Sequence, residues 1–225
     1  MAVRIIPDLY YNSEKPPALA LKGALDSASA EMYRTAQADP ELRGMGTTCV
    51  AMAILVPEVY VAYVGDSRLY LLREGGFYQL TEDHTVVGEM VRKGIITRDQ
   101  ARRHEERNVL SMSMGGRPEI DASYWEKPMI LRSGDRLLVC TDGLHDLVSD
   151  SEMQAIIADS PTHVAVPELI EAAKRNGGHD NITAALVRVF ILAKQSGTDF
   201  KATREFSISS EWPNRLVSAP PLVSG

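Results

Sequence analysis

The spacing of apolar residues along the chain is helical at first and becomes strand-like in the middle. Between residues 18 and 38, apolar residues recur every three or four positions, which predicts an amphipathic helix. Asp39-Pro40 follows and is expected to end it. A shorter apolar pattern over residues 1–11 predicts another helix, which Pro7 should end or kink at Ile6 because proline lacks a backbone N–H.

Short apolar runs then predict a meander of antiparallel strands. The runs are rich in Val, Leu, Tyr and Ile, and turn residues such as Pro57-Glu58, Gly65-Asp66 and Glu74-Gly75-Gly76 separate them. The expected strands span residues 47–56, 59–64, 68–73 and 77–80. Several are apolar at nearly every position, which is typical of strands covered on both faces.

The second half of the chain alternates between helical and strand patterns. Residues 81–116 are charged and helical in pattern, with glycines as interruptions. Further strands are expected at 124–126, 136–140 and 182–192, and helices at 150–158 and 161–174. Strands flanked by helices predict an α+β layered domain over residues 1–192. From residue 193 to 225, Ser, Thr, Pro and charged residues dominate, which predicts a disordered tail.

Composition excludes several classes of protein. The chain has 225 residues, 44% of them hydrophobic, with a formal net charge of −6, which suits one globular domain. Without a Lys/Arg cluster we expect no nucleic-acid partner. No apolar run reaches the roughly 20 residues of a membrane span, and no signal peptide is recognisable, so we expect no membrane association and a cytoplasmic location. Cys49 and Cys140 lie in apolar runs and are expected to be buried thiols.

Three aspartates lie near glycines at the ends of predicted strands. They are Asp66 after Gly65, Asp142 before Gly143, and Asp180 after a Gly-Gly-His sequence. A carboxylate at the end of a rigid strand is well placed to bind a hard cation such as Mg²⁺ or Mn²⁺. Aspartate in a turn often only bonds its own backbone, so turn formation stays open as an alternative for each. No Cys/His pair has the spacing of a zinc site.

Seven short motifs follow one another in a fixed order along the chain. They are ELRGMGTT at 41–48, VGDSR at 64–68, LTEDHT at 80–85, RNVL at 107–110, GD at 134–135, TDGL at 141–144 and DNIT at 180–183. Each motif alone is weak, but the ordered set resembles that of the type 2C protein phosphatases, the PPM family, in its bacterial form.

The resemblance implies a four-layer α/β/β/α sandwich of two antiparallel sheets flanked by helices. It implies a metal-dependent protein serine/threonine phosphatase that acts in signal transduction. Two Mg²⁺ or Mn²⁺ ions, with a third, weaker site, would activate a water that hydrolyses phosphoserine and phosphothreonine. Phosphoprotein substrates and a cognate Ser/Thr kinase are the implied partners.

The resemblance also assigns roles to residues that match the motifs. Asp142 and Asp180 match metal ligands, and Asp66 matches a ligand of the weaker site. Asn181 and Gly143 would support the site. Asn181 would brace the loop by hydrogen bonds, or would only cap a turn.

A further part of the resemblance concerns the flap, residues 85–116, which in the family lies beside the cleft and influences substrate choice. Asp83 and His84 would order its entrance. Basic residues of the flap could meet an acidic phosphopeptide, although a solvated charged face is the commoner explanation.

One part of the family pattern is not found in this sequence. The family begins with a strand carrying an Arg and a Glu-Asp pair, and a second strand that ends in an Asp-Gly-x-Gly-Gly loop. No residue here matches that Arg or the bridging Asp, so we assign no catalytic residue. Residues 1–6 resemble a later part of the family's first helix, and we expect the chain to start at an internal methionine. The alternative function is therefore a catalytically inactive, truncated chain or pseudophosphatase that acts as a binding or regulatory module.

Overall fold

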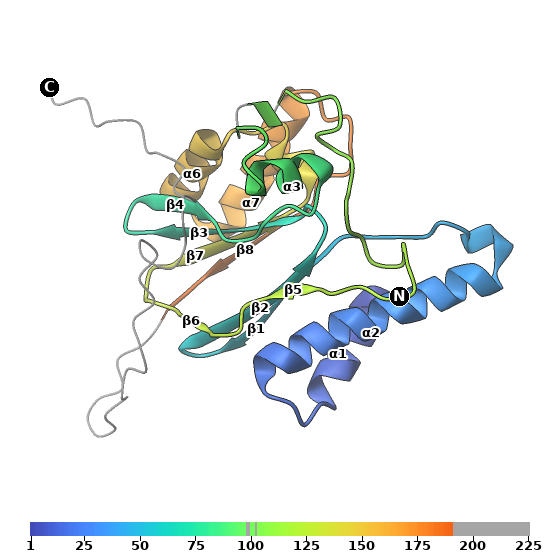
Figure 1. The fold of residues 1–225 in the computed structure, drawn as a ribbon. Coiled ribbons are helices and arrows are strands. Elements are labelled where there is room, and N and C mark those ends of the chain that lie inside the picture. The colour runs from blue at the N-terminus through green and yellow to red at the C-terminus, as the bar shows by residue number, and fades with distance from the viewer. Residues whose placement is uncertain (98–99, 102, 191–225) are drawn as a thin grey trace, which may run out of the picture. The chain divides into compact units, whose positions relative to one another are not determined.

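The computed structural model describes residues 1–97, 100–101 and 103–190, and the chain forms two compact units (Figure 1). The first unit contains Met1–Ser67 and Glu82–Pro128, and the second contains Arg68–Thr81 and the described chain from Met129 onward. The predicted tail at 193–225 lies outside the described residues. No helix in the described part of the chain is long and apolar enough to cross a membrane.

Two helices open the first unit. They are α1 (Ala2–Tyr11) and α2 (Pro17–Ala38). The start of α2 is set by Pro17, whose fixed φ suits the first helical turn, and Asp39-Pro40 ends the helix as predicted. Pro7 does not end the first helix at Ile6, because α1 continues to Tyr11 with Pro7 inside it, and the alternative of a kink stays a prediction. Burial of Ile6 in the same apolar cluster as α2 residues offsets the hydrogen bond that Pro7 removes.

An antiparallel sheet completes the first unit. Its strands are β1 (Cys49–Leu55), β2 (Glu58–Val64) and β5 (Ser123–Tyr124), in the order β1-β2-β5. The β1–β2 hairpin pairs Cys49 with Val64 and Leu55 with Glu58. Leu25 and Met32 of α2 are buried in one apolar cluster with Val64 of β2, so α2 covers a face of this sheet. The 3-10 turn η1 (Pro40–Leu42) leads from α2 toward β1.

The second unit contains an antiparallel sheet of order β4-β3-β7-β8. Its strands are β3 (Arg68–Arg73), β4 (Gly76–Gln79), β7 (Arg136–Cys140) and β8 (Ala184–Arg188), and the unit also holds the short β6 (Met129–Ile130). Its helices are α5 (Asp142–His145), α6 (Asp150–Asp159) and α7 (Thr162–Arg175). Every residue of β3 after Arg68 is buried, as expected for a strand covered on both faces.

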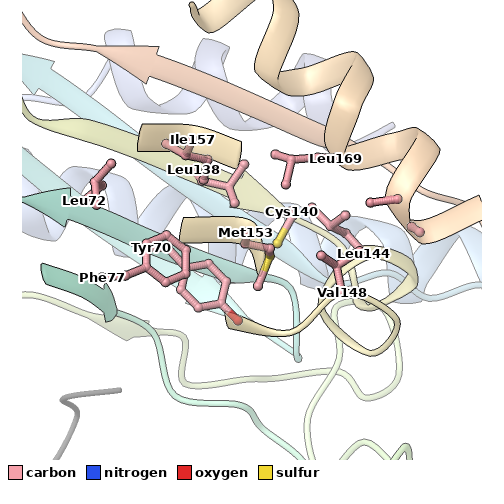
Figure 2. Packing of buried hydrophobic residues seen from close by; sticks show 12 residues of the cluster. Tyr70, Leu72, Phe77, Leu138, Cys140, Leu144, Val148, Met153, Ile157 and Leu169 are labelled. Atoms are coloured by element: carbon pink, nitrogen blue, oxygen red, sulfur yellow. The ribbon is translucent and has the colours of Figure 1, made fainter. Parts of the chain in front are cut away.

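The core of the second unit lies between its sheet and two helices (Figure 2). Tyr70 of β3 stacks on Phe77 of β4 with ring centroids 4.8 Å apart. Met153 and Ile157 of α6 and Leu169 of α7 are fully buried in the same cluster. The predicted fold class is therefore confirmed: the structure is α+β, with two antiparallel sheets flanked by helices.

The helical prediction for residues 81–116 is largely wrong. Among the described residues of this segment, helix is found in α3 (Val86–Arg92) and at residues 100–101, and single bridges join Thr85 to Leu110 and Thr47 to Met114. Most of the other described residues of the segment are irregular and exposed or half-buried, so its charge reflects exposure rather than helix. The final strand is also shorter than the predicted 182–192.

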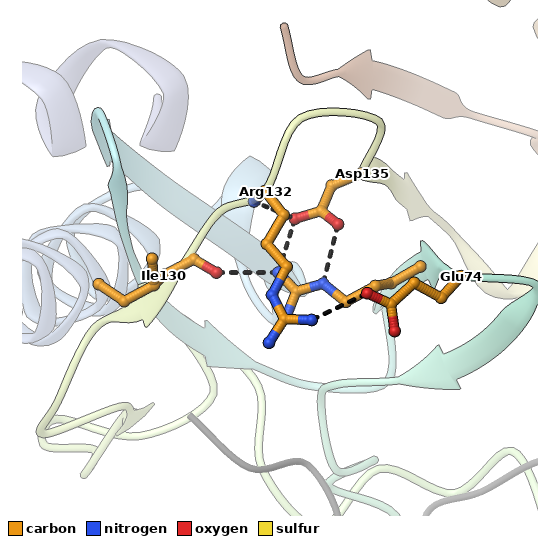
Figure 3. Close-up of polar contacts among 5 residues, drawn as sticks. Glu74, Ile130, Arg132 and Asp135 are labelled. Carbon is orange, nitrogen blue, oxygen red and sulfur yellow. Dashed lines mark hydrogen bonds and ion pairs between the residues drawn. The ribbon is translucent and has the colours of Figure 1, made fainter. Parts of the chain in front are cut away.

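A buried ion pair fixes the turn before β7 (Figure 3). Arg73 donates through Nε and Nη2 to the two carboxylate oxygens of Asp135, at 2.8 and 2.6 Å, and both side chains are almost fully buried. Arg73 Nη2 also donates to the carbonyl of Ile130 at 2.8 Å, and the carboxylate of Asp135 accepts the Arg132 N–H at 2.7 Å. The GD motif at 134–135 thus has a structural role in this unit, since a buried charge pair broken on one side is strongly destabilising.

Candidate functional site

The turn that carries Asp142 lies between β7 and α5 in the second unit. Thr141 is the N-cap residue of α5, and Asp142 is the first residue of the helix. One carboxylate oxygen of Asp142, Oδ1, accepts the N–H of Gly143 at 2.9 Å. A Cβ at Gly143 would collide with the backbone carbonyl of Asn181, so glycine is required here for close approach.

The segment that carries Asp180 lies directly beside that turn. The hydroxyl of Thr141 accepts the N–H of Thr183 at 3.1 Å and donates to the carbonyl of Asn181 at 3.3 Å. The N–H of Thr141 donates to the carbonyl of Thr183 at 3.1 Å. Asp180 itself is exposed, and its Oδ1 accepts the N–H of Asn181 at 2.6 Å. The two predicted metal aspartates of this unit therefore sit on neighbouring, hydrogen-bonded segments.

Asn181 contributes to this arrangement through its backbone. Its carbonyl accepts the hydrogen bond of the Thr141 hydroxyl, and the same carbonyl leaves no room for a Cβ at Gly143. The predicted support by the Asn181 side chain stays a prediction.

The turn that carries Asp66 belongs to the first unit and is built differently. Gly65 has a φ of +96°, and a Cβ there would collide with the side chain of Thr48, so two separate reasons require glycine. The hydroxyl groups of Thr48 and Ser67 are hydrogen-bonded at 2.8 Å. Asp66, which directly precedes Ser67, is half-buried.

His84 holds this turn through both its backbone and its ring. The Gly65 N–H donates to His84 Nδ1 at 3.0 Å, and the His84 N–H donates to the Gly65 carbonyl at 3.0 Å. Because Nδ1 accepts, the ring proton lies on Nε2, which donates to the Ser123 hydroxyl at 2.9 Å. The ring also stacks on Tyr63, with centroids 5.3 Å apart.

Burial is the main reason that the pKa of His84 is lowered, and the charge of Arg92 lowers it further. The neutral ring is the form that these hydrogen bonds need.

The base of the predicted flap begins at the same residue. The His84 carbonyl accepts the N–H of Ser111, and the Thr85 hydroxyl caps α3 by accepting the N–H of Gly88 at 3.0 Å. Asp83, immediately before His84, is half-buried. The ordering role of Asp83 and His84 at the flap entrance stays a prediction, and the contacts of His84 give it a physical basis.

The donor atoms of the second unit suit a hard cation. Asp142 and Asp180 offer carboxylate oxygens, and Mg²⁺ is commonly bound by one or two carboxylates together with waters and substrate phosphate. Among residues 1–97, 100–101 and 103–190, no three or more His, Cys, Asp or Glu side chains gather closely enough to hold a metal ion. The residues present therefore fit a cation by donor type, with Asp142 and Asp180 as the two candidate ligands of the second unit.

Reasoning from the sequence missed Thr141 and Thr183. Both lie inside quoted motifs, TDGL and DNIT, but only the pairing of the two motifs in space gives the hydroxyl of Thr141 its partners. The one available signal was a threonine directly before the aspartate at the end of a buried strand.

Comparison with known proteins finds a matching family model and related chains. The family model described as protein phosphatase 2C matches residues 8–90. The protein phosphatase PhpP of Streptococcus pneumoniae is 39% identical over 150 residues, which cover 66% of this chain and 60% of that protein. The serine/threonine phosphatase stp of Listeria innocua is 34% identical over 202 residues, which cover 86% of this chain and 79% of that protein.

Solved structures show the same fold. The serine/threonine phosphatase PstP/Ppp of Mycobacterium tuberculosis superposes with a TM-score of 0.75 at 31% identity, covering 84% of this chain and 82% of that one. The catalytic domain of PstP in complex with 2 manganese ions gives a TM-score of 0.74 at 29% identity, covering 84% and 79%.

Proposed function

Because the chain belongs to the protein phosphatase 2C family, we propose that it hydrolyses phosphoserine and phosphothreonine in proteins with the help of Mg²⁺ or Mn²⁺. The observation that supports this proposal is the hydrogen-bonded pairing of the Asp142 turn with the segment that follows Asp180. The manganese ions named for the PstP structure add support for a metal.

The carboxylates of Asp142 and Asp180 would hold the cation. In each, Oδ1 already accepts a backbone N–H, from Gly143 and from Asn181, which fixes the orientation of the side chain. The second oxygen, Oδ2, is then the atom that each residue offers as a ligand. A bound cation supplies neutralisation of the phosphate charge and activation of a water for attack at phosphorus.

The remaining residues would act by orientation. Thr141, Gly143 and Asn181 keep the two carboxylates on adjacent segments. We retain Asp66 as the proposed ligand of a weaker site, carried by the turn that His84 and Gly65 hold. Phosphoproteins are the proposed substrates, and a cognate Ser/Thr kinase is a proposed partner.

One observation favours a second function, in which the chain binds phosphoproteins without hydrolysing them. The described residues contain no cluster of three metal ligands, and two carboxylates alone bind a cation more weakly than three. In that case the chain would act as a regulatory module.

The experiment that tests the proposal is hydrolysis of a phosphothreonine peptide with and without Mn²⁺. The wild-type chain is compared with Asp142→Asn, and with Asp159→Asn as a matched control that removes an exposed carboxylate from α6. Hydrolysis that needs Mn²⁺, is lost in Asp142→Asn and persists in Asp159→Asn supports the phosphatase. A folded chain that binds the peptide without turnover supports the second function, and a chain that does neither contradicts both.

A further inference from the structure

The pairing of β7 with β8 ends in an unusual hydrogen bond. The last paired residues are Cys140 and Ala184, and one step further Thr141 faces Thr183. The N–H of Thr141 donates to the carbonyl of Thr183 at 3.1 Å. In a regular antiparallel pair the return bond runs from the N–H of Thr183 to the carbonyl of Thr141. Here that N–H donates to the hydroxyl of Thr141 instead, at 3.1 Å.

The carbonyl of Thr141 is occupied by helix α5. It accepts the N–H of Leu144 at 3.0 Å and the N–H of His145 at 3.5 Å. A carbonyl oxygen has two lone pairs, so both acceptor positions are in use. The hydroxyl therefore replaces the carbonyl of the same residue in the sheet, and the carbonyl is free to begin the helix whose first residue is Asp142.

The hydroxyl is also not used in the ordinary way of an N-cap. An N-cap threonine usually accepts an N–H from the first turn of its own helix, but the side chain of Thr141 makes no such bond. Its proton goes to the carbonyl of Asn181 at 3.3 Å, so the hydroxyl bonds to the Asp180 segment on both sides of Ile182.

We infer that Thr141 is a positioning residue, whose hydroxyl takes over a sheet hydrogen bond from its own carbonyl and so fixes the Asp142 turn against the Asp180 segment. The inference rests on the proposed function, in which these two aspartates hold the cation. Serine carries the same hydroxyl and can replace threonine in this role. Valine has the same shape without the hydroxyl and cannot.

The test compares Thr141→Val with Thr141→Ser, and adds Thr141→Ala as a second variant without a hydroxyl. Thr35→Val is the matched control, because the Thr35 hydroxyl also donates to a backbone carbonyl, that of Glu31 at 2.9 Å in α2. Amide hydrogen exchange of the metal-free chain is measured at Thr183 and Leu144. In Thr141→Val and Thr141→Ala the hydroxyl is gone, so the N–H groups of Thr183 and Leu144 compete for the carbonyl of residue 141. We expect about three- to tenfold faster exchange at one or both of these amides. Thr141→Ser and Thr35→Val should exchange as the wild type does.

The second readout is Mn²⁺ affinity, measured by water proton relaxation without any substrate. We expect Thr141→Val to bind Mn²⁺ about tenfold more weakly, as is usual when a group that orients metal ligands is lost, with Thr141→Ser rescuing the affinity. A merely structural role would lower the melting temperature and leave the Mn²⁺ affinity of the folded chain unchanged.

Three results would count against the inference. Unchanged exchange at both amides in Thr141→Val refutes the hydrogen-bond replacement, whatever the chain does with metal. Faster exchange with unchanged Mn²⁺ affinity refutes the positioning role while leaving the proposed phosphatase intact. A wild-type chain that binds no Mn²⁺ counts against the proposed function and against ligand positioning together, and the exchange measurement still decides the replacement of the carbonyl.

Discussion

The Asp66 turn of the first unit and the Asp142 turn of the second each position an aspartate, but different groups stabilise the two turns. Each brings an aspartate to the end of a strand beside a glycine. The Asp66 turn is held from the interior, by the buried ring of His84 and by the bond between Thr48 and Ser67. The Asp142 turn is held at the surface, by the hydroxyl of Thr141 and the backbone of an exposed segment.

The glycines of the two turns also differ in the reason why glycine is required. Gly65 precedes its aspartate and needs both its positive φ and the space beside Thr48. Gly143 follows its aspartate and is needed only because the Asn181 carbonyl lies against it. Buried hydrogen bonds are expensive to break, whereas exposed ones can exchange with water. Changes at the Asp66 turn should therefore lower stability, and changes at the Asp142 turn should mainly alter metal binding and turnover.

The largest expected effect is that of His84→Ala. The substitution leaves the buried N–H of Gly65 without its acceptor and opens a cavity beside Tyr63, so we expect the free energy of unfolding to fall by about 3 kcal/mol. Urea unfolding followed by circular dichroism measures it. His163→Ala, at an exposed position of α7, is the control and should change stability by less than about 0.5 kcal/mol. Equal effects of the two variants would show that the ring does not hold the Asp66 turn.

The next prediction compares alanine substitutions at the two glycines. Gly65→Ala should lower the free energy of unfolding by about 2 kcal/mol, through the strained φ and the collision with Thr48. Gly143→Ala should weaken Mn²⁺ binding more than it lowers stability, because the exposed Asn181 segment can move aside. Unfolding and Mn²⁺ titration are measured on both. Gly23→Ala, in α2 with open space around it, is the control. A larger loss of stability in Gly143→Ala than in Gly65→Ala would contradict the contrast between the turns.

The sequence predicts the strands of the second unit better than it predicts the contacts of either turn. The apolar runs at 68–73 and 136–140 coincide with β3 and β7, because glycines and charged residues bound them closely. Residues 81–116 mislead, because charge is common both to exposed helices and to exposed irregular chain. The motifs identify the aspartates themselves.

What holds the aspartates depends on pairing across long separations in the chain. The partners of Thr141 are 40 and 42 residues away, and the ion pair of Arg73 with Asp135 spans 62. Which donor meets which acceptor over such distances follows from strand register, which local patterns do not determine.

Acid should weaken the first unit through His84. Burial lowers the pKa of His84 below its usual value of 6.5, so the unfolded chain takes up the proton more readily than the folded chain. The contribution to stability is complete above pH 6.5 and is lost as the pH falls toward the lowered pKa of the folded state. Unfolding free energies from pH 7.5 to pH 5 measure this on the wild type and on His84→Asn, whose side-chain oxygen can still accept the Gly65 N–H. An equally steep decline in His84→Asn would assign the pH dependence to another group.

The smallest expected effect belongs to the hydroxyl of the Asp66 turn. Ser67→Ala removes the bond to Thr48, and we expect the free energy of unfolding to fall by about 0.5 to 1 kcal/mol, with Mn²⁺ affinity at the Asp142 turn unchanged. Thr141→Val removes one hydroxyl from the other turn and is the natural counterpart, expected to alter Mn²⁺ affinity more than stability. Both variants are measured by urea unfolding and by Mn²⁺ titration. If Ser67→Ala weakens Mn²⁺ binding as much as Thr141→Val does, the two hydroxyl groups serve the same purpose and burial does not separate the turns. If Ser67→Ala affects stability alone, burial explains the difference between the turns: buried hydrogen bonds stabilise the fold of a turn, and exposed hydrogen bonds orient its carboxylate.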